Sequence, residues 1–458
     1  MSNTLEFVRS WAATRGRHSL PDLLDWVEKL NRSTHVEIRK NRLSDSDTWF
    51  YDEKTGTIHN KNNSFFSISG LQFRENGAVT AEQPILIQNE IGFLGILCQM
   101  QNGLLHFLMQ AKIEPGNVNN IQISPTIQAT KSNFTQMHGG RKPAYLDYFT
   151  RQENCTVMVD QIQSEQSSRF LGKRNRNTIL LIPEERKVEA GKNFRWMTLG
   201  QIKALMRREN LVNMDTRTVL SCIPYAMYHG EEREELRGFF KDKALYSSIF
   251  EPRENLLPPV TGFLSQYRMF DGSERSTVRL DELAGWTMTD EGIRCQGKAP
   301  FFVTYCDIAI EGREVQRWTQ PLFEAVGKAR FGLFTTVQEG KRLFLVKALA
   351  EAGCFDRLEL APTVQLEAGV EPQNEIDRLF STRYKAGTGV LYDVVLSEEG
   401  GRFYHEENHN RILDIDLKDM PELPEGYFWL DYYTLNLLGQ VNNCLNIQLR
   451  NLLSLLEV

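Results

Sequence analysis

The chain has 458 residues, of which 41% are hydrophobic and 24% are charged. This length predicts two or three domains, and this composition excludes disordered, collagen-like and fibrous chains. Its 53 basic and 59 acidic side chains give a formal net charge of -6, the wrong sign for wrapping nucleic acid or an anionic membrane over a broad surface. We therefore expect neither as a partner, and an anionic ligand would need a local basic cluster.

The seven cysteines are scattered without a CxxC pair, a pattern that favours a reducing compartment over a disulfide framework and disfavours structural zinc. The segment from Met1 to Leu20 contains no continuous apolar stretch, so the sequence predicts neither a secretory signal nor a membrane anchor. We expect a cytoplasmic protein. The HExxH, EF-hand, Walker and GxGxxG motifs do not occur, so we expect no metal and no cofactor.

An N-terminal helical arm is predicted over residues 1–44. Ser19 and Pro21 begin a helix in it, and the apolar residues that follow recur at helical spacing: Leu23, Leu24, Val27 and Leu30. Such a spacing gives one apolar face, so we expect the arm to pack against the rest of the chain.

Turn and capping residues predict further elements along the chain. Two apolar segments flank Asn102 and Gly103, a strong signal for a β-hairpin. Thr198 and Gln201 match a capping box ahead of a helix, and Asp215 is expected to cap the next helix. Strands therefore precede helices in this part of the chain, which predicts an α+β fold with a mixed sheet flanked by helices.

An internal duplication organises the sequence. The segment 83–128 aligns with 320–365 without a gap, with 13 of 46 positions identical. The segment 160–180 aligns with 393–413, with 9 of 21 identical. Because a repeat of this length is a complete structural unit, the sequence predicts a tandem duplication. We name residues 45–228 the first copy and 282–458 the second copy, with a connector at 229–281.

In two stretches of the first copy, polar side chains occur at every second or fourth position. This spacing places the polar side chains of each stretch on one face of an extended strand. One stretch carries His106, Gln110, Lys112 and Glu114; the other carries Gln122, Ser124, Thr126, Gln128 and Thr130. The matching stretches of the second copy are partly apolar. A solvated sheet face explains either stretch alone equally well, but the contrast between the copies favours a pocket for a polar, sugar-like ligand in the first copy.

A basic cluster in the first copy comprises four cations: Arg169, Lys173, Arg174 and Arg176. At the last three of these positions the second copy has Glu406, Glu407 and His409. A solvated run of charge is the ordinary explanation of such a cluster, but the reversal of charge makes a phosphate or diphosphate site competitive. His138, in a predicted loop, is either solvated or a proton-transfer residue.

Four segments together resemble the NDP-hexose 2,3-dehydratases: QAKIEPGN at 110–117, SPTIQATKSNF at 124–134, SEQ at 164–166 with KRNRN at 173–177, and EVQRWTQP at 314–321. The resemblance extends from about Trp49 to the C-terminus. It implies a homodimer whose subunits each contain two Nudix-like domains, and an enzyme of deoxysugar biosynthesis. Its substrate would be a dTDP-4-keto-6-deoxyglucose-like sugar nucleotide, and a 3-ketoreductase would act on the unstable product.

The implied reaction needs a base, donors for an enolate oxygen and an acid for the departing hydroxyl group. We expect Glu114 or His138 as base, Lys112 as enolate donor and Tyr145 as acid. The substrate is assigned to polar and basic side chains: Gln110, Asn117, Gln122, Thr126, Gln128, Thr130, Asn133, Arg169, Lys173, Arg174, Arg176 and Asn177. Among these, residues 122–133 would hold the hexose, and the four cations the diphosphate.

Two other functions are compatible with a duplicated fold of this kind. A non-catalytic sugar-nucleotide binder or regulator would use the same pocket without turnover, because a fold alone does not establish activity. A hydrolase is the weaker alternative, since the clustered glutamates of a Nudix box do not follow Glu114.

Overall fold

The computed structural model describes residues 4–63, 65–130, 142–152, 154–228, 230–251, 255–311 and 315–458. The chain begins with helices α1 (Thr4–Ala12) and α2 (Leu20–Ser33). Helix α2 confirms the predicted helix, because Ser19 and Asp22 form a capping box at its start and Leu23 and Val27 are buried. In the described residues, no helix is long and apolar enough to cross a membrane.

The first copy contains a seven-stranded mixed sheet. Its order is β10-β11-β6-β7-β12, with β8 paired to β7 and β9 to β6, and only the β6–β11 pair is parallel. The strands are β6 (Gly92–Gln101), β7 (Leu104–Ile113), β8 (Ile121–Ser124), β9 (Ile127–Ala129), β10 (Thr156–Ser164), β11 (Arg174–Ile182) and β12 (Phe194–Met197). The predicted hairpin is confirmed, because Asn102 and Gly103 have positive φ in the β6–β7 turn, as a type I′ turn requires.

The second copy contains a sheet with the same pairings. Its order is β20-β19-β18-β23-β22, with β21 paired to β18 and β24 to β19, and β18 and β23 are parallel. The strands are β18 (Arg330–Gln338), β19 (Lys341–Leu349), β20 (Glu359–Pro362), β21 (Val364–Leu366), β22 (Val390–Ser397), β23 (Glu407–Asp414) and β24 (Tyr427–Asp431). The two aligned sequence segments therefore occupy equivalent strands.

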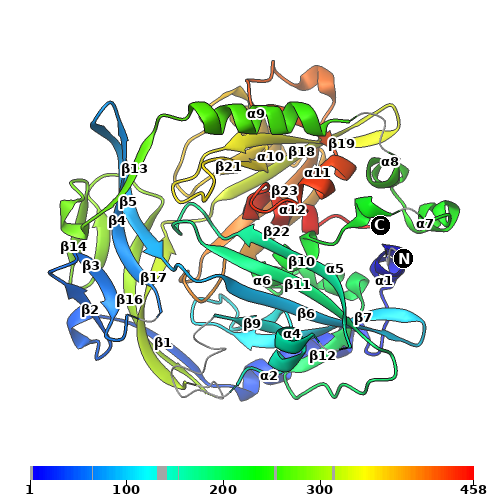
Figure 1. Ribbon diagram of the computed structural model, residues 1–458, viewed down its shortest axis with the longest axis horizontal. Coiled ribbons are helices and arrows are strands. Elements are labelled where there is room, and N and C mark those ends of the chain that lie inside the picture. The colour runs from blue at the N-terminus through cyan, green and yellow to red at the C-terminus, as the bar shows by residue number, and fades with distance from the viewer. Residues whose placement is uncertain are drawn as a thin grey trace.

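Two five-stranded antiparallel sheets interlock the copies (Figure 1). One joins β13 (Glu274–Val278), from the connector, to β2 (Trp49–Asp52), β3 (Thr57–Asn60), β4 (Ser67–Glu75) and β5 (Ala78–Ile87). The other joins β1 (Val36–Asn41), from the N-terminal arm, to β14 (Trp286–Thr289), β15 (Gly292–Cys295), β16 (Phe301–Ile310) and β17 (Arg317–Ala325). Each small sheet is thus completed by a strand that precedes the other copy.

Helices pack on the large sheets and fill the connector. They are α4 (Leu146–Arg151), α5 (Leu199–Met206), α6 (Met214–Ser221), α7 (Arg233–Phe239), α8 (Lys243–Phe250), α9 (Leu257–Phe270), α10 (Glu375–Ala386), α11 (Tyr432–Leu438) and α12 (Ile447–Ser454). The Thr198–Gln201 capping box of α5 is confirmed. The prediction that Asp215 caps α6 is wrong: Asn213 is the N-cap, because its side chain accepts from the Thr216 amide.

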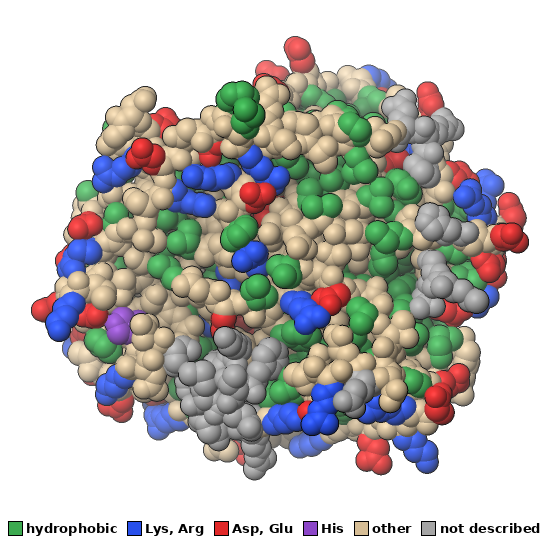
Figure 2. Space-filling model, viewed as in Figure 1, with side chains coloured by type: hydrophobic (Ala, Val, Ile, Leu, Met, Phe, Trp, Pro, Cys, Tyr) green, Lys and Arg blue, Asp and Glu red, His purple; other side chains and the backbone are tan. Residues whose placement is uncertain are grey.

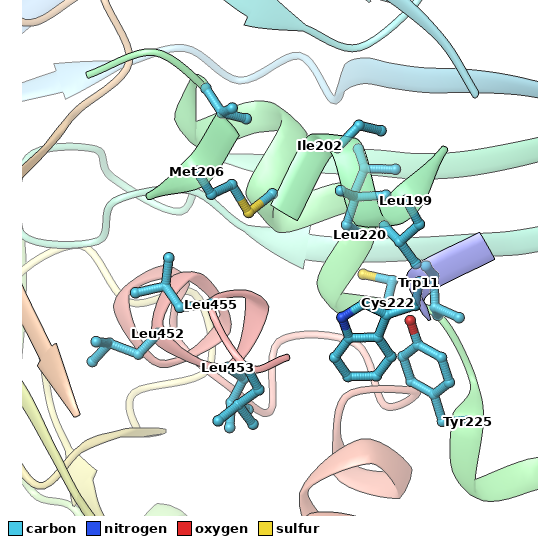
Figure 3. Close-up of a cluster of buried hydrophobic side chains, with 14 of the residues drawn as sticks. Trp11, Leu199, Ile202, Met206, Leu220, Cys222, Tyr225, Leu452, Leu453 and Leu455 are labelled. Carbon is cyan, nitrogen blue, oxygen red and sulfur yellow. The ribbon is translucent and has the colours of Figure 1, made fainter. Parts of the chain in front are cut away.

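One hydrophobic core runs between the copies. Figure 3 shows Leu199, Ile202 and Met206 of α5 near Leu220 of α6, with Leu452 and Leu453 of α12 facing them. Trp11 of α1 and Tyr225 pack in the same cluster, with ring centroids 5.2 Å apart. The N-terminal arm therefore packs on the body of the protein, as the apolar face of its helices predicts.

Two glycines at equivalent positions hold the copies together. The Gly116 amide donates to the Gly400 carbonyl, and the Gly353 amide donates to the Ser167 carbonyl. A Cβ on Gly116 would lie 1.5 Å from the Phe403 carbonyl oxygen, and one on Gly353 would lie 1.7 Å from that of Phe170. Only glycine allows backbones to approach so closely. The molecule is therefore a mixed α+β protein whose two copies contact each other through reciprocal loops.

Candidate active site

A cavity of about 380 Å³ opens in the first copy and is completed by the second copy. The first copy contributes polar and charged residues from several strands and loops: Gln88, Lys112, Glu114, Gln128, Thr130, Glu165, Lys173, Asn175 and Asp215. The second copy contributes Trp318, Thr319, Gln320, Glu399, Gly401 and Arg402. This volume lies in the usual range for small-molecule sites.

The end of β7 places an ion pair at the cavity wall. Lys112 Nζ lies 3.2 Å from Glu114 Oε1, and both side chains are largely buried. Gln128 on β9 donates to the same carboxylate oxygen at 3.1 Å, and the Asn213 side chain donates to Gln128 Oε1 at 3.2 Å. Because β7 and β9 both pair with β6, the ends of the two predicted polar stretches, Lys112 with Glu114 and Gln128 with Thr130, meet here.

Three further carboxyl groups line the cavity. Glu165, directly after β10, accepts from the Asn175 side chain and from the Gln166 amide. Burial raises the pKa of Glu165 and also that of Asp215, the latter well above its ordinary value. Burial raises the pKa of Glu399 to about 8, with the neighbouring Glu114 charge adding to the shift. The sequence comparison between the copies did not identify these three carboxyls.

Two cations face these carboxyls. Lys173 donates to the Glu90 carbonyl at 2.6 Å, and burial lowers its pKa to about 8. Arg402 comes from the loop between β22 and β23 of the second copy, donates to Gln88 Oε1 at 3.2 Å, and stacks over Phe65 and Phe66. Its buried Nε has no hydrogen-bond partner, and among the described residues it forms no ion pair. Arg402 can therefore bind an anion that enters the cavity.

Aromatic side chains form the apolar part of the cavity lining. They are Trp49, Phe65, Phe93, Phe170 and Trp318. Flat rings of this kind can stack on a nucleobase or on the apolar face of a sugar. Figure 2 shows acidic and basic side chains interspersed over one face of the molecule.

Of the predicted site residues that the structure describes, five line this cavity: Lys112, Glu114, Gln128, Thr130 and Lys173. Gln110 lines a neighbouring cavity of about 330 Å³. Several others are buried in hydrogen bonds with the protein: Asn117 with Asn120, Gln122 with Ser397, Thr126 with Leu97 and Leu108, and Asn177 with Asn175. Asn133 and His138 lie outside the described residues.

The remaining predicted side chains have partners of their own. The Tyr145 hydroxyl donates to the Glu189 carbonyl and accepts from the Gly191 amide. Arg174 stacks over Phe355, and Arg176 pairs with Asp160. Arg169 pairs with Glu367 of the second copy at 2.9 Å and stacks over Phe301. The cluster of cations seen in the sequence is therefore dispersed, with Lys173 as the member that lines the cavity.

Arg402 aligns with Arg169 of the first copy. Each arginine crosses to the other copy, where Arg169 meets Glu367 and Arg402 meets the cavity. Glu367 in turn aligns with Thr130 when the first of the two alignments is extended without a gap. The aligned copies contained the signal for Arg402, but the crossing between copies could not be inferred from either copy alone.

Comparison with known proteins identifies the family of the chain. A family model described as NDP-hexose 2,3-dehydratase matches residues 20–223 and 258–456. The chain belongs to this family. It is accordingly a sugar 2,3-dehydratase, an enzyme of the carbon–oxygen lyase type.

Curated relatives extend over nearly the whole chain. A dTDP-4-dehydro-6-deoxy-alpha-D-glucopyranose 2,3-dehydratase from Streptomyces violaceoruber is 36% identical, covering 94% of this chain and 95% of the relative. Proteins of the same name from Saccharopolyspora spinosa and Amycolatopsis orientalis are 35% and 32% identical, covering 100% and 94% of this chain and 95% and 89% of the relatives. These matches favour the enzyme over the non-catalytic binder.

Proposed function

We propose that the chain dehydrates dTDP-4-keto-6-deoxyglucose across C2 and C3 in the cavity of the first copy. The relatives are named for this substrate, which supports it. The observation that supports this location is the Lys112–Glu114 pair, which stands in the cavity beside Arg402. A carboxylate, an ammonium group and an anion-binding arginine are the groups that this reaction on a sugar nucleotide needs.

In the proposed mechanism, the C4 ketone acidifies the C3 hydrogen and the Glu114 carboxylate removes it. The electrons of the C3–H bond form an enolate whose negative charge lies on O4. Lys112 donates to that oxygen. This interaction needs little reorganisation of the site, because the ammonium group is already held beside Glu114. Gln128 and Asn213 fix the orientation of the carboxylate.

Collapse of the enolate re-forms the C4 carbonyl, makes the C2–C3 double bond and breaks the C2–O bond, so that water is lost. The resulting enol gains a proton at C2 and loses one from O3, which gives a 3,4-diketo-2,6-dideoxy sugar nucleotide. The net reaction is neither an oxidation nor a reduction. Turnover therefore needs no electron donor or acceptor.

The nucleotide portion of the substrate is assigned to the rest of the cavity. Arg402 and Lys173 bind the diphosphate, because both are buried cations at the cavity wall and charge-assisted bonds to phosphate are strong there. The aromatic lining that includes Trp49 and Trp318 accommodates the thymine base. Thr130 and Asn175 line the same cavity and are assigned to the sugar hydroxyls.

We further propose that residues 45–228 and 282–458 are two Nudix-like domains, that the protein is a cytoplasmic homodimer, and that a 3-ketoreductase takes up its unstable product. The equal strand order of the two large sheets supports the first proposal, and the free state of all seven cysteines supports a reducing compartment. Size-exclusion chromatography with light scattering tests the dimer: a mass near 52.8 kDa would refute it, and twice that mass is expected.

A turnover assay tests the function. The purified protein is incubated with dTDP-4-keto-6-deoxyglucose and a 3-ketoreductase, and the product is measured by mass spectrometry. We expect a product that has lost one water molecule and that, after reduction by the 3-ketoreductase and its hydride donor, has gained two hydrogen atoms. Release of free nucleotide would instead identify a hydrolase, and unchanged substrate with measurable binding would identify a sugar-nucleotide binder.

A further inference from the structure

Asp215 is a carboxyl group of the cavity that the mechanism above does not use. It is the second residue of α6 and is 2% exposed. It lines the same cavity as Lys112 and Glu114. Glu165 and Glu399 accept hydrogen bonds from the Gln166 and Gly401 amides, whereas among the described residues no donor reaches the Asp215 carboxyl. Asp215 is therefore the carboxyl of this cavity that is not committed to accepting a hydrogen bond.

The second copy has a hydrogen-bond donor at the position equivalent to Asp215. Extending the second of the two alignments without a gap places Gln448 at Asp215, and the same alignment places Glu398 at Glu165. The Gln448 amide donates to Glu398 Oε1 at 3.2 Å. A carboxyl group can donate in the same place only when it carries a proton. The equivalent position therefore holds a permanent donor, Gln448, in the second copy and an ionisable carboxyl, Asp215, in the first.

Burial and the surrounding charges favour the protonated form of the Asp215 carboxyl. Burial is the largest cause of its raised pKa, followed by the charges of Glu165, Glu399 and Glu114, while Lys112 acts in the opposite direction. Two buried arginines also lie near, and each donates to a backbone carbonyl of another segment: Arg217 to Ser397, and Arg450 to Ser164. This environment therefore favours the protonated, neutral form of the Asp215 carboxyl inside a cavity that also holds the Glu114 carboxylate.

We propose that Asp215 is the general acid that protonates the C2 hydroxyl group as it leaves. This role rests on the proposed function. Glu114 takes the C3 proton, the C2–O bond breaks, and the Asp215 proton joins the departing hydroxide to form water. When C2 then gains a proton and O3 loses one, Glu114 supplies the first and the Asp215 carboxylate takes the second, so both groups return to their starting states.

The role predicts a dependence on the leaving group. A hydroxide needs a proton in order to leave, and chloride does not. The Asp215→Asn variant keeps a donor side chain, as Gln448 does in the second copy, but cannot transfer a proton. With the 2-hydroxy substrate, its kcat should fall by roughly 10²–10⁴-fold, the usual contribution of a general acid. With a 2-chloro-2-deoxy analogue of the same sugar nucleotide, its kcat should equal that of the wild type.

The test compares both substrates with wild type, Asp215→Asn and the control Glu359→Gln, which removes another buried carboxyl whose pKa is raised to about 8. Equal losses of Asp215→Asn on both substrates would overturn the role. Should the variant unfold, the wild-type pH profile decides: turnover of the hydroxy substrate should fall at high pH and that of the chloro analogue should not, and two parallel falls would overturn it. A wild type inactive on both would refute the proposed function itself.

Discussion

The two copies share a network of side-chain hydrogen bonds and differ in the charges around it. In the first copy, Asn213, Gln128 and Glu114 are joined by hydrogen bonds; in the second, Asn446, Gln365 and Glu351 are joined in the same way. Around this network, four positions differ: Lys112, Thr130, Lys173 and Asp215 become Leu349, Glu367, Glu406 and Gln448. The hydrogen-bonded network is therefore common to both copies, and the charges next to it are not.

The equivalent arginines of the two copies, Arg169 and Arg402, have different surroundings. Arg169 meets Glu367, whereas Arg402 at the equivalent position reaches the cavity that Thr130 lines. Leu349 replaces the lysine of the first copy, and burial raises the pKa of Glu351 to about 7. The cavity of the first copy therefore holds the Glu114 carboxylate beside Lys112, and Arg402 without an ion-pair partner among the described residues, whereas in the second copy Glu351 has a leucine beside it and Glu367 pairs with an arginine.

Exchanging the lysine and the leucine should produce a large effect on turnover. Lys112→Leu gives the first copy the composition of the second, and we expect kcat to fall by about 10²–10³-fold, the cost of removing one enolate donor. Steady-state kinetics with the sugar nucleotide measures this. The reciprocal Leu349→Lys variant places a partner beside Glu351 and should leave kcat unchanged, so a comparable loss in both variants would contradict the assignment to the first copy.

Removing each arginine should separate ligand binding from stability. Arg402→Ala should weaken dTDP-sugar binding about 10- to 100-fold, since a hydrogen bond to a charged group contributes about 1.5–3 kcal/mol, and the salt dependence of Kd should decrease. Arg169→Ala should lower the melting temperature by leaving Glu367 without its arginine. Isothermal titration calorimetry at two salt concentrations measures the binding, and thermal unfolding of both variants measures the stability. An unchanged Kd for Arg402→Ala would refute the role of Arg402 in binding.

The contact between copies should be sensitive to a single methyl group. Gly116→Ala and Gly353→Ala should each reduce the free energy of unfolding by about 1–3 kcal/mol, because the added Cβ forces backbones apart. Gly238→Ala is the control, since a Cβ there meets no atom within 4 Å. Chemical denaturation of the three variants measures this, and equal stabilities would show that the reciprocal loops do not hold the copies together.

Buried carboxyls of the second copy should give a smaller, pH-dependent effect. Burial raises the pKa of Glu359 to about 8, above its unfolded value of about 4.3. The folded state therefore binds more protons, and the stability that Glu359 contributes is complete below the unfolded pKa and is lost as pH rises through about 8. Glu359→Gln should raise the melting temperature relative to wild type more at pH 9 than at pH 6. An equal difference at both pH values would contradict the shift.

The sequence predicted the elements whose signals are local. The α2 and α5 capping boxes and the Asn102–Gly103 hairpin are confirmed because each depends on residues close together in the chain. Family membership is also confirmed. The exchange of β1 and β13 between the small sheets was not predicted, because strand pairing over such separations leaves no local pattern.

The candidate site was predictable in part. Period-two alternation placed Lys112 and Glu114 on one face, and the structure brings both to the cavity. The cation cluster was a weaker guide, since Arg174 and Arg176 have partners outside the cavity. Asp215 was taken for a helix cap, although comparison with Gln448 of the second copy marks it as a position where charge differs. A buried carboxyl facing other carboxyls becomes visible only when the elements are assembled.

The most direct test of the assignment to the first copy compares Glu114→Gln with Glu351→Gln, the same change at equivalent positions of the two copies. Dehydration of dTDP-4-keto-6-deoxyglucose is followed by mass spectrometry, with a 3-ketoreductase present. We expect Glu114→Gln to lose turnover by about 10²–10⁴-fold while still binding the sugar nucleotide, and Glu351→Gln to turn over at the wild-type rate. Full activity of Glu114→Gln, or loss of activity in Glu351→Gln alone, would contradict this assignment.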